Sequence, residues 1–193
     1  MPTLSPPAVP LTDGHVLLRP FTLDDVPAVT AACQDPEISR WTALIPWPYD
    51  EEHARSWIST HASLWERGEA AEWAVTAPGD GHLMGALGLR PFDWEERTVT
   101  AGYWMAASER NHGAATSALG LGVRWAFEAL DLAVVTLVTK IGNIASERVA
   151  QKAGFSVVGE TAHYAHPEAP DEHLHVKKWQ TSAGEWARQP SVP

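Results

Sequence analysis

The stretch from Arg110 to Gly120, RNHGAATSALG, holds two glycines and a run of alanines directly before an apolar segment that continues to about residue 129. The first turn of a helix offers backbone N–H groups that have no partner inside the helix, together with the positive end of the helix dipole. An anion can bind there if side chains stay out of the way, and Gly113, Ala114 and Ala115 meet that condition. The stretch therefore predicts a helix whose first turn comes close to a ligand.

Two familiar phosphate-binding loops do not fit this stretch. A P-loop ends in Gly-Lys-Ser/Thr, whereas Gly113 is followed here by Ala114. A dinucleotide-binding fold needs GxGxxG directly after a first strand and an acidic residue about 20 positions further on. Neither pattern is present, so a different anion-binding loop is expected.

Hydrophobic periodicity predicts an α/β domain with a mixed sheet. Strands are expected at 15–21, 72–77, 82–91, 97–105, 133–139, 155–160 and 173–179, and helices at 23–34, 51–67, 113–129 and 143–153. Thr22 with Asp25 forms a capping box, Asp50 caps the second helix and Gly68 ends it. The turn at 78–81 predicts an antiparallel hairpin, and the sheet should gain parallel neighbours where the central helix crosses over.

Residues 11–181 are expected to form one domain between a disordered tail at 1–10 and a second tail at 182–193. Fourteen Lys and Arg against twenty-four Asp and Glu give a formal charge of −10, which argues against nucleic acid as a partner. No stretch approaches the about 20 apolar residues of a membrane span, and the N-terminus lacks signal-peptide order, so the expected location is cytoplasmic. The lone cysteine, Cys33, is expected in the core.

The pattern Arg110-x-x-Gly113-x-Ala115 resembles the Q/R-x-x-G-x-G/A loop of the GNAT acetyltransferase superfamily. AGYWMAASERNHGAATSALGLGVRWAFEAL followed by NIASERVAQKAGF resembles the RimJ/RimL branch, which acetylates ribosomal-protein N-termini. The resemblance covers about 15–180 and is most specific over 101–155. It implies the GNAT acyl-CoA N-acyltransferase fold, a mixed and mostly antiparallel sheet flanked by helices, with a splayed central strand pair.

The same resemblance implies acetyl-CoA as co-substrate. Loop residues would hold its pyrophosphate through backbone N–H groups: Arg110, Asn111, His112, Gly113, Ala114, Ala115 and Thr116. Met105 with neighbouring main chain, and Asn143, would contact the pantetheine arm. The alternatives are tight helix–sheet packing for the loop and simple helix capping for Asn143.

The implied mechanism is direct attack of an uncharged amine on the thioester in a ternary complex. A main-chain N–H around Trp104 and Met105 would steady the developing oxyanion, and Ser146 would protonate the leaving thiolate. The alternative for Ser146 is a solvent-facing helix serine. No acyl-enzyme is needed, and Cys33 is a poor nucleophile candidate.

A catalytic base is harder to assign, because Thr100 stands where members of this branch often have a glutamate. Substitutes are Glu95 and Glu96 in the hairpin loop, and Glu160 with His163 near the end of the chain. Each of these is more often a solvated surface residue. A base is also dispensable if the amine loses its proton to water before it binds.

Trp41, Trp47 and Tyr49 follow the first predicted helix, where the resemblance places the acceptor site. Aromatic rings in an acidic field suit a cationic or aromatic amine, either a protein N-terminus or a small molecule. Core packing of Trp41 is an equal alternative. Four histidines invite a zinc hypothesis, but their spacing is loose and no cysteine joins them, so no metal is expected: His163, His166, His173 and His175.

Two rival functions stay open at this point. A non-catalytic binding protein could keep the fold and lose turnover, as the missing acid at Thr100 suggests. A transferase could also use another acyl-CoA, such as succinyl-CoA. A homodimer is compatible with the aromatic-rich composition, which includes ten tryptophans.

Overall fold

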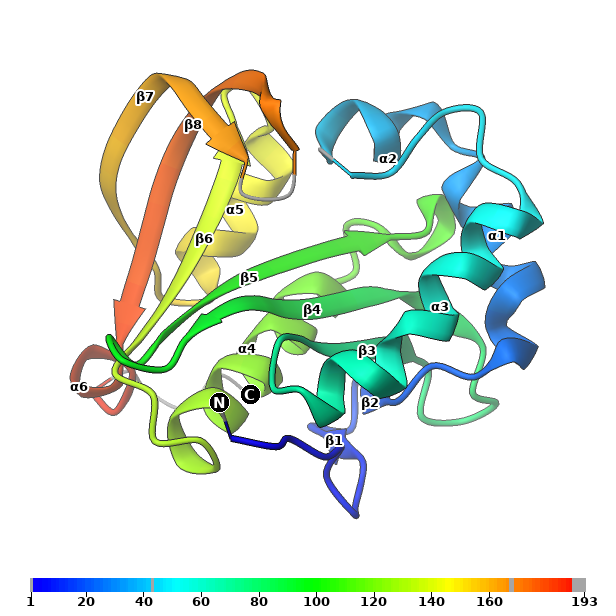
Figure 1. The fold of residues 1–193 in the computed structure, drawn as a ribbon, viewed down its shortest axis with the longest axis horizontal. Helices are drawn as coiled ribbons and strands as arrows, with labels where there is room; N and C mark the ends of the chain where they lie inside the picture. The colour runs from blue at the N-terminus through cyan, green and yellow to red at the C-terminus, as the bar shows by residue number, and fades with distance from the viewer. Residues whose placement is uncertain (1, 43, 167–168, 189–193) are drawn as a thin grey trace.

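The computed structural model describes residues 2–42, 44–166 and 169–188. These residues form an eight-stranded sheet in the order β1-β2-β3-β4-β5-β6-β8-β7, with helices on both faces (Figure 1). The strands are β1 Leu11–Thr12, β2 Leu17–Arg19, β3 Ala71–Thr76, β4 Leu83–Asp93, β5 Thr98–Met105, β6 Val134–Lys140, β7 Ser156–His166 and β8 Ala169–Ser182. The helices are α1 Val26–Cys33, α2 Pro36–Trp41, α3 Glu51–Glu66, α4 Ala114–Glu128, α5 Ile144–Lys152 and α6 Ala183–Trp186, with short 3-10 turns η1 Leu23–Asp25 and η2 Ala107–Glu109.

The sheet diverges at its centre. Strands β5 and β6 form the parallel pair that the α4 crossover predicts, and their pairing ends at Ala101 opposite Leu137. Beyond that point β5 continues on β4 as far as Met105, while β6 continues on β8 as far as Lys140. The two strands therefore separate, as Figure 1 shows, and the expected splayed pair is confirmed.

The two faces of the sheet carry separate cores. Helices α4 and α5 cover one face, and α1 and α3 cover the other. The last turn of α3 also contributes Trp65 to the first core. Its ring packs edge-on with those of Trp73 and Trp125, with ring centroids 5.0 to 5.6 Å apart. Such aromatic pairs contribute about 1 kcal/mol each beyond the area that they bury. Packed cores therefore cover both faces of the sheet.

The sequence prediction and the structure agree at the helix caps. The Asp25 carboxylate accepts the Thr22 N–H, and the Asp50 carboxylate accepts the His53 N–H. Gly68 has φ +66°, the left-handed conformation that ends a helix. Arg19 pairs with Asp25 at 2.7 Å, and these contacts hold the pKa of the Asp25 carboxyl below its usual value despite its burial.

The structure differs from the prediction near both ends of the chain. Within the expected N-terminal tail, Leu4 is buried and its N–H donates to the Trp65 carbonyl. Within the expected C-terminal tail, α6 brings Trp186 to 6.3 Å from Phe127. Both segments contribute apolar contacts, which a composition rich in proline and small polar residues conceals.

Strands β7 and β8 are longer than the 155–160 and 173–179 expected, and they pair with each other as an antiparallel hairpin. Pro170 lies in the first part of β8, before Val176, where β8 does not pair with β6. The missing N–H of this proline therefore removes no hydrogen bond to β6.

In the described part of the chain, no helix combines the length and apolarity needed to cross a bilayer.

Candidate active site

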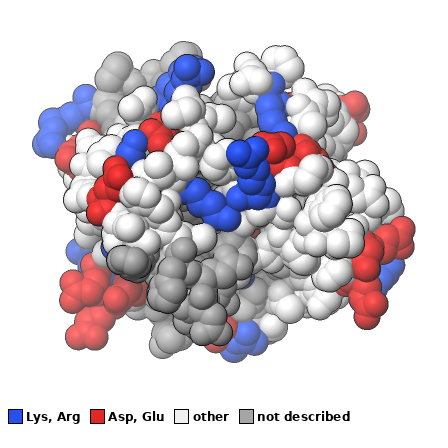
Figure 2. Space-filling view, turned by 90° about the horizontal axis from the view of Figure 1, so that it is seen from above, with Lys and Arg blue, Asp and Glu red and all other residues white. Residues whose placement is uncertain are grey.

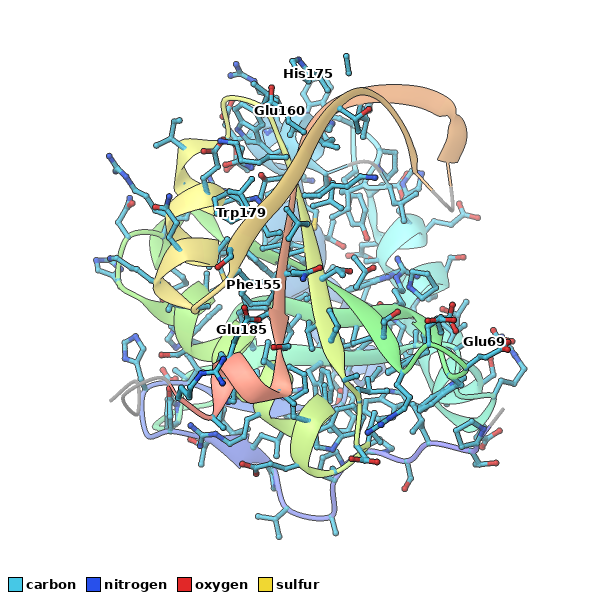
Figure 3. All side chains as sticks on the ribbon, turned by 90° about the vertical axis from the view of Figure 1, so that its left-hand side faces the viewer. Glu69, Phe155, Glu160, His175, Trp179 and Glu185 are labelled. Atoms are coloured by element: carbon cyan, nitrogen blue, oxygen red, sulfur yellow. The ribbon has the colours of Figure 1, made fainter. Side chains whose placement is uncertain are left out.

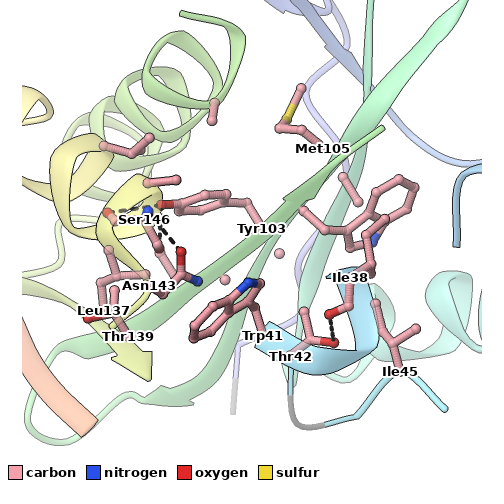
Figure 4. Close-up of a pocket in the computed structure, with 18 of the residues that line it drawn as sticks. Ile38, Trp41, Thr42, Ile45, Tyr103, Met105, Leu137, Thr139, Asn143 and Ser146 are labelled. Carbon is pink, nitrogen blue, oxygen red and sulfur yellow. Dashed lines mark hydrogen bonds between the residues drawn. The ribbon is translucent and has the colours of Figure 1, made fainter. Parts of the chain in front are cut away.

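A cavity of about 1000 Å³ occupies the space where β5 and β6 diverge (Figure 4). Its walls come from the far halves of these two strands, the first turn of α4, the start of α5 and the segment around α2. Most sites predicted from the sequence therefore meet in one place. The lining includes Trp41, Tyr49, Trp104, Met105, Arg110, Asn111, Gly113, Ala114, Ala115, Thr116, Asn143 and Ser146.

The first turn of α4 is built as the sequence predicts. Gly113 is the N-cap with φ +90°, a conformation that residues with a Cβ rarely adopt. The first intrahelical bond runs from the Ser117 N–H to the Gly113 carbonyl, so the N–H groups of the three residues before Ser117 are those that a helix leaves without a helical partner. Asn111 and His112 are exposed, and the His112 carbonyl accepts a bond from His15 Nε2 at 2.9 Å. The first turn of α4 is thus open to the cavity, and the His15 side chain holds the preceding loop in place.

The Arg110 side chain is used within the protein. Its Nε donates to the Met105 carbonyl at 3.1 Å, and its Nη2 lies 2.7 Å from Asp35 Oδ2. Asp35 also caps α2 by accepting the Glu37 N–H, and that bond, together with Arg110, holds the pKa of the Asp35 carboxyl below its usual value. The Arg110 side chain therefore anchors the loop, and the groups that the loop leaves for an anion are its backbone N–H groups.

The open edge of β5 presents particular backbone groups to the cavity. The Ala106 N–H donates to the Met84 carbonyl, which fixes the phase of the β4–β5 ladder. Because bonded pairs alternate along antiparallel strands, the backbone of Trp104 faces β4, and the backbone groups of Tyr103 and Met105 face the cavity. Of the two N–H groups expected near the thioester, that of Met105 is on the open edge. The Trp104 indole is buried in the core under α1 and α3.

Ser146 has a partner that the sequence analysis missed. The Tyr103 hydroxyl lies 2.8 Å from Ser146 Oγ, and both residues line the cavity (Figure 4). Burial raises the pKa of Tyr103 to about 12, an effect that the bond to Ser146 partly offsets, so the phenol stays protonated at neutral pH. Asn143 caps α5 through a 3.2 Å bond from the Ser146 N–H to its Oδ1, as predicted. Strand alternation with Ala101 and Met105 was the signal that could have revealed Tyr103.

The wall opposite α5 is aromatic. Trp41 lies on the cavity, with its Nε1 donating to Glu37 and the Arg40 guanidinium 4.8 Å from its ring centroid. Tyr49 also lines the cavity, is buried, and has its pKa raised chiefly by that burial. Trp47 is 59% exposed and lies outside the lining.

Lys140 joins this wall to the sheet. Its Nζ donates to the carbonyls of Arg40 and Thr42 at 3.0 and 3.2 Å. Since Arg110 holds Asp35 at the other end of the helix, α2 is fastened at both ends across the cavity.

Of the substitute bases proposed from the sequence, the three whose side chains the structure describes, Glu95, Glu96 and Glu160, do not reach the cavity lining. Glu95 and Glu96 lie in the turn before β5, at the end of that strand opposite the site, and their N–H groups bond to the Asp93 carboxylate. Glu160 pairs with His175 at 3.0 Å across the β7–β8 hairpin (Figure 3). Thr100 bonds to the Thr136 hydroxyl at 2.9 Å and carries no acid.

The histidine cluster is only partly visible. The side chains of His163, His166 and His173 lie outside the described part of the structure, so their roles stay predictions. Among the side chains that are described, no group of three or more His, Cys, Asp or Glu is placed to hold a metal ion.

The face seen from above carries basic and acidic side chains next to one another near its middle (Figure 2).

Comparison with known families identifies this arrangement. The family model described as an acetyltransferase (GNAT) domain matches residues 15–156. The chain belongs to the GNAT acetyltransferase family. The uncharacterized N-acetyltransferase YoaA of Bacillus subtilis is 27% identical over 154 residues, which cover 80% of this chain and 86% of YoaA.

Solved structures share the GNAT fold at low sequence identity. RimJ of Mycobacterium smegmatis, in complex with CoA-disulfide, superposes with a TM-score of 0.79 and 22% identity over 93% of this chain and 88% of RimJ. Spermidine N-acetyltransferase from Vibrio cholerae, in complex with CoA and spermine, gives a TM-score of 0.75 and 14% identity over 91% of this chain and all of that one, at 100%. The protein is therefore a GNAT-family N-acetyltransferase whose fold matches that of enzymes solved with coenzyme A.

Proposed function

We propose that this protein transfers an acetyl group from acetyl-CoA to an amine by direct attack in a ternary complex. One observation carries the proposal: the open first turn of α4 and the unpaired edge of β5 line the same cavity. A diphosphate needs the first feature, and an amide-containing arm needs the second. The GNAT family and the two similar structures with bound coenzyme A support it.

The residues present fit acetyl-CoA. The N–H groups of Ala114, Ala115 and Thr116 would bind the pyrophosphate, next to the left-handed turn at Gly113. The main chain next to Met105, with the open-edge groups of Tyr103, and Asn143 would pair with the pantetheine arm, which leaves the Met105 N–H for the thioester. When bound, acetyl-CoA supplies the activated acetyl group.

The protein's own groups would then act on the reacting atoms. The Met105 N–H donates to the carbonyl oxygen as negative charge develops there. Ser146, hydrogen-bonded to Tyr103, gives a proton to the departing sulfur. A free thiol has a pKa of about 8.5, so the thiolate is already a fair leaving group and the acid contributes a modest factor.

The acceptor is an amine, either a protein N-terminus or a small molecule. The aromatic rings of Trp41 and Tyr49 on the cavity wall, and the formal charge of −10, suit a cation. The similar structures include a ribosomal-type acetyltransferase, RimJ, and a spermidine acetyltransferase, so amines of both kinds belong in the first screen.

Release of free thiol from acetyl-CoA, measured with a panel of peptides and small amines, tests the proposal. Steady thiol release and an acetylated product by mass spectrometry are expected for at least one acceptor. Tight coenzyme A binding without release across the panel would favour the non-catalytic alternative. Comparing acetyl-CoA with succinyl-CoA separates the two acyl donors.

A further inference from the structure

A buried carboxylate lies in the cavity wall, on the face of the sheet that carries α1 and α3. Glu72, in β3, is only 4% exposed. Every residue of that strand is buried, and most of them are apolar. It is one of three carboxylates that line the cavity among the side chains that the structure describes. Glu37 is committed to Trp41 and Arg40, and Glu109 to Ser108 next to the cofactor loop. Glu72 is also the most buried of these three side chains.

The neighbouring strands leave room for this carboxylate. A Cβ at Gly88 of β4 would lie 2.5 Å from Glu72 Oε2, so the carboxylate rests directly on the Gly88 backbone. Gly88 pairs with Gly102 of β5, where an added Cβ would meet nothing within 4 Å. No side chain at Gly88 or Gly102 stands between the Glu72 carboxylate and the point where β5 leaves β6.

The distance suits proton transfer. Adjacent strands lie about 4.8 Å apart, so a carboxylate over Gly88 is about 5 Å from an atom placed over Gly102. That separation is spanned by one water molecule or by an amine itself. Gly102 directly precedes Tyr103 and follows Ala101, the last residue of β5 paired to β6, so this atom would sit beside the proposed thioester site.

Ionisable groups from several elements surround Glu72. Arg90 Nε lies 3.1 Å from Glu72 Oε1, from the same face of β4. His61 on α3, near Arg90, has its pKa lowered to about 4 by burial and by the Arg90 charge, so it is neutral. Tyr49, His53 and Lys140 come from the other walls of the same cavity.

We propose that Glu72 is the acceptor-site carboxylate, which binds the incoming primary ammonium group and takes its proton, in place of the acid that is missing at Thr100. The inference rests on the proposed function. One proton passes from the ammonium to Glu72, which keeps it through the transition state and releases it to solvent after the product has formed. The amine nitrogen bonds to the acetyl carbon, the carbon–sulfur bond breaks, and Ser146 protonates the sulfur. The nitrogen's second proton leaves to solvent, from which Ser146 regains the proton that it gave. No oxidant or other co-reactant is required.

The pH dependence of kcat/KM distinguishes this role from a structural one. When Glu72 is ionised, the free enzyme and the ammonium ion together carry the same number of protons as the transition state. kcat/KM is therefore independent of pH from 6.5 to 8 for an amine whose pKa is higher. In Glu72→Gln the amine must lose its proton to water first, and kcat/KM should rise about tenfold per pH unit. The deficit of the variant is thus largest at pH 6.5 and shrinks as pH rises.

Two further variants keep the test decisive if Glu72→Gln folds poorly. Gly88→Ala keeps the carboxylate but pushes it aside, and should reproduce the sloping profile. Asp25→Asn removes the charge of another buried ion pair, Arg19 with Asp25, outside the cavity lining, and should keep the level profile. Coenzyme A affinity, from calorimetry, should stay within about twofold in all three.

The outcomes separate the two proposals. If the wild type releases thiol with an amine and Glu72→Gln has a parallel pH profile, the role of Glu72 is overturned and the proposed function stands. If the wild type is silent across the whole amine panel, the proposed function falls and this inference falls with it. A sloping profile in both Glu72→Gln and Gly88→Ala, with a level one in Asp25→Asn, supports the assignment.

Discussion

Acidification should weaken this fold through one buried histidine on α3. His61 is 4% exposed, packs edge-on against Phe21 and Trp57 with ring centroids 5.3 and 4.6 Å away, and neither ring nitrogen has a hydrogen-bond partner among the described residues. Burial, with a smaller effect of the Arg90 charge, lowers its pKa from 6.5 to about 4. His61 therefore takes up a proton near pH 6.5 in the unfolded chain, but only near pH 4 in the folded protein.

The sign and size follow from proton linkage. Because the unfolded state binds more protons, the free energy of unfolding is highest above pH 6.5 and falls as pH drops toward 4. A shift of this size corresponds to about 3 kcal/mol in full, of which about 2 kcal/mol is lost between pH 7 and pH 5.

Urea unfolding followed by tryptophan fluorescence at pH 7, 6 and 5 measures this loss. His61→Phe keeps a planar ring beside Phe21 and Trp57 and removes the titrating group, and His61→Leu serves if the larger ring strains the packing. Either variant should lose about 2 kcal/mol less than the wild type over this range. His82, whose pKa is raised mainly by Asp80, acts in the opposite direction but cancels in the difference. Equal losses in wild type and both variants would refute the reasoning.

Three further changes test the site. Gly113→Val forces a branched side chain into φ +90° and should weaken coenzyme A binding at least about tenfold by calorimetry, whereas Gly79→Val, in a turn with open space, should not. Ser146→Ala and Tyr103→Phe should each lower kcat about tenfold or less while leaving coenzyme A affinity unchanged, and a loss of affinity in both would point to binding instead of proton donation. Lys140→Met removes both bonds to the end of α2, so amide hydrogen exchange in that helix should speed up; unchanged exchange would show that the bonds do not hold it.

Local signals in the sequence predicted most of the frame of this molecule. Asp50 and Gly113 act as the helix starts that their residue types indicate, because capping and left-handed turns depend on the nearest few residues. The splayed strand pair was expected only through family resemblance, since no local pattern reports where two strands part. The meeting of the α4 turn, Asn143 and Ser146 in one cavity was likewise expected through the motifs that carry that resemblance.

Residues whose role depends on a neighbouring strand escaped prediction. Glu72 lies in a strand that is buried on both faces, so period-two alternation gives no sign of which way it points, and the glycine that makes room for it is 16 positions away. Glu95 and Glu160 attracted attention as acids in expected loop and terminal segments, yet each lies outside the cavity lining. Pairing register decides such cases, and register is a property of two segments together.

The double fastening of α2 has a consequence for how acceptor preference can diversify. Asp35, at one end of the helix, is bonded through Arg110 to the loop before α4, and the Arg40 and Thr42 carbonyls, at the other end, are bonded through Lys140 to β6. The Lys140 contacts engage backbone atoms, so the side chains at positions 40 and 42 can be exchanged without loosening that support. Substitutions on the cavity side of α2 can thus change which acceptors fit, while the helix and the loop before α4 keep their positions.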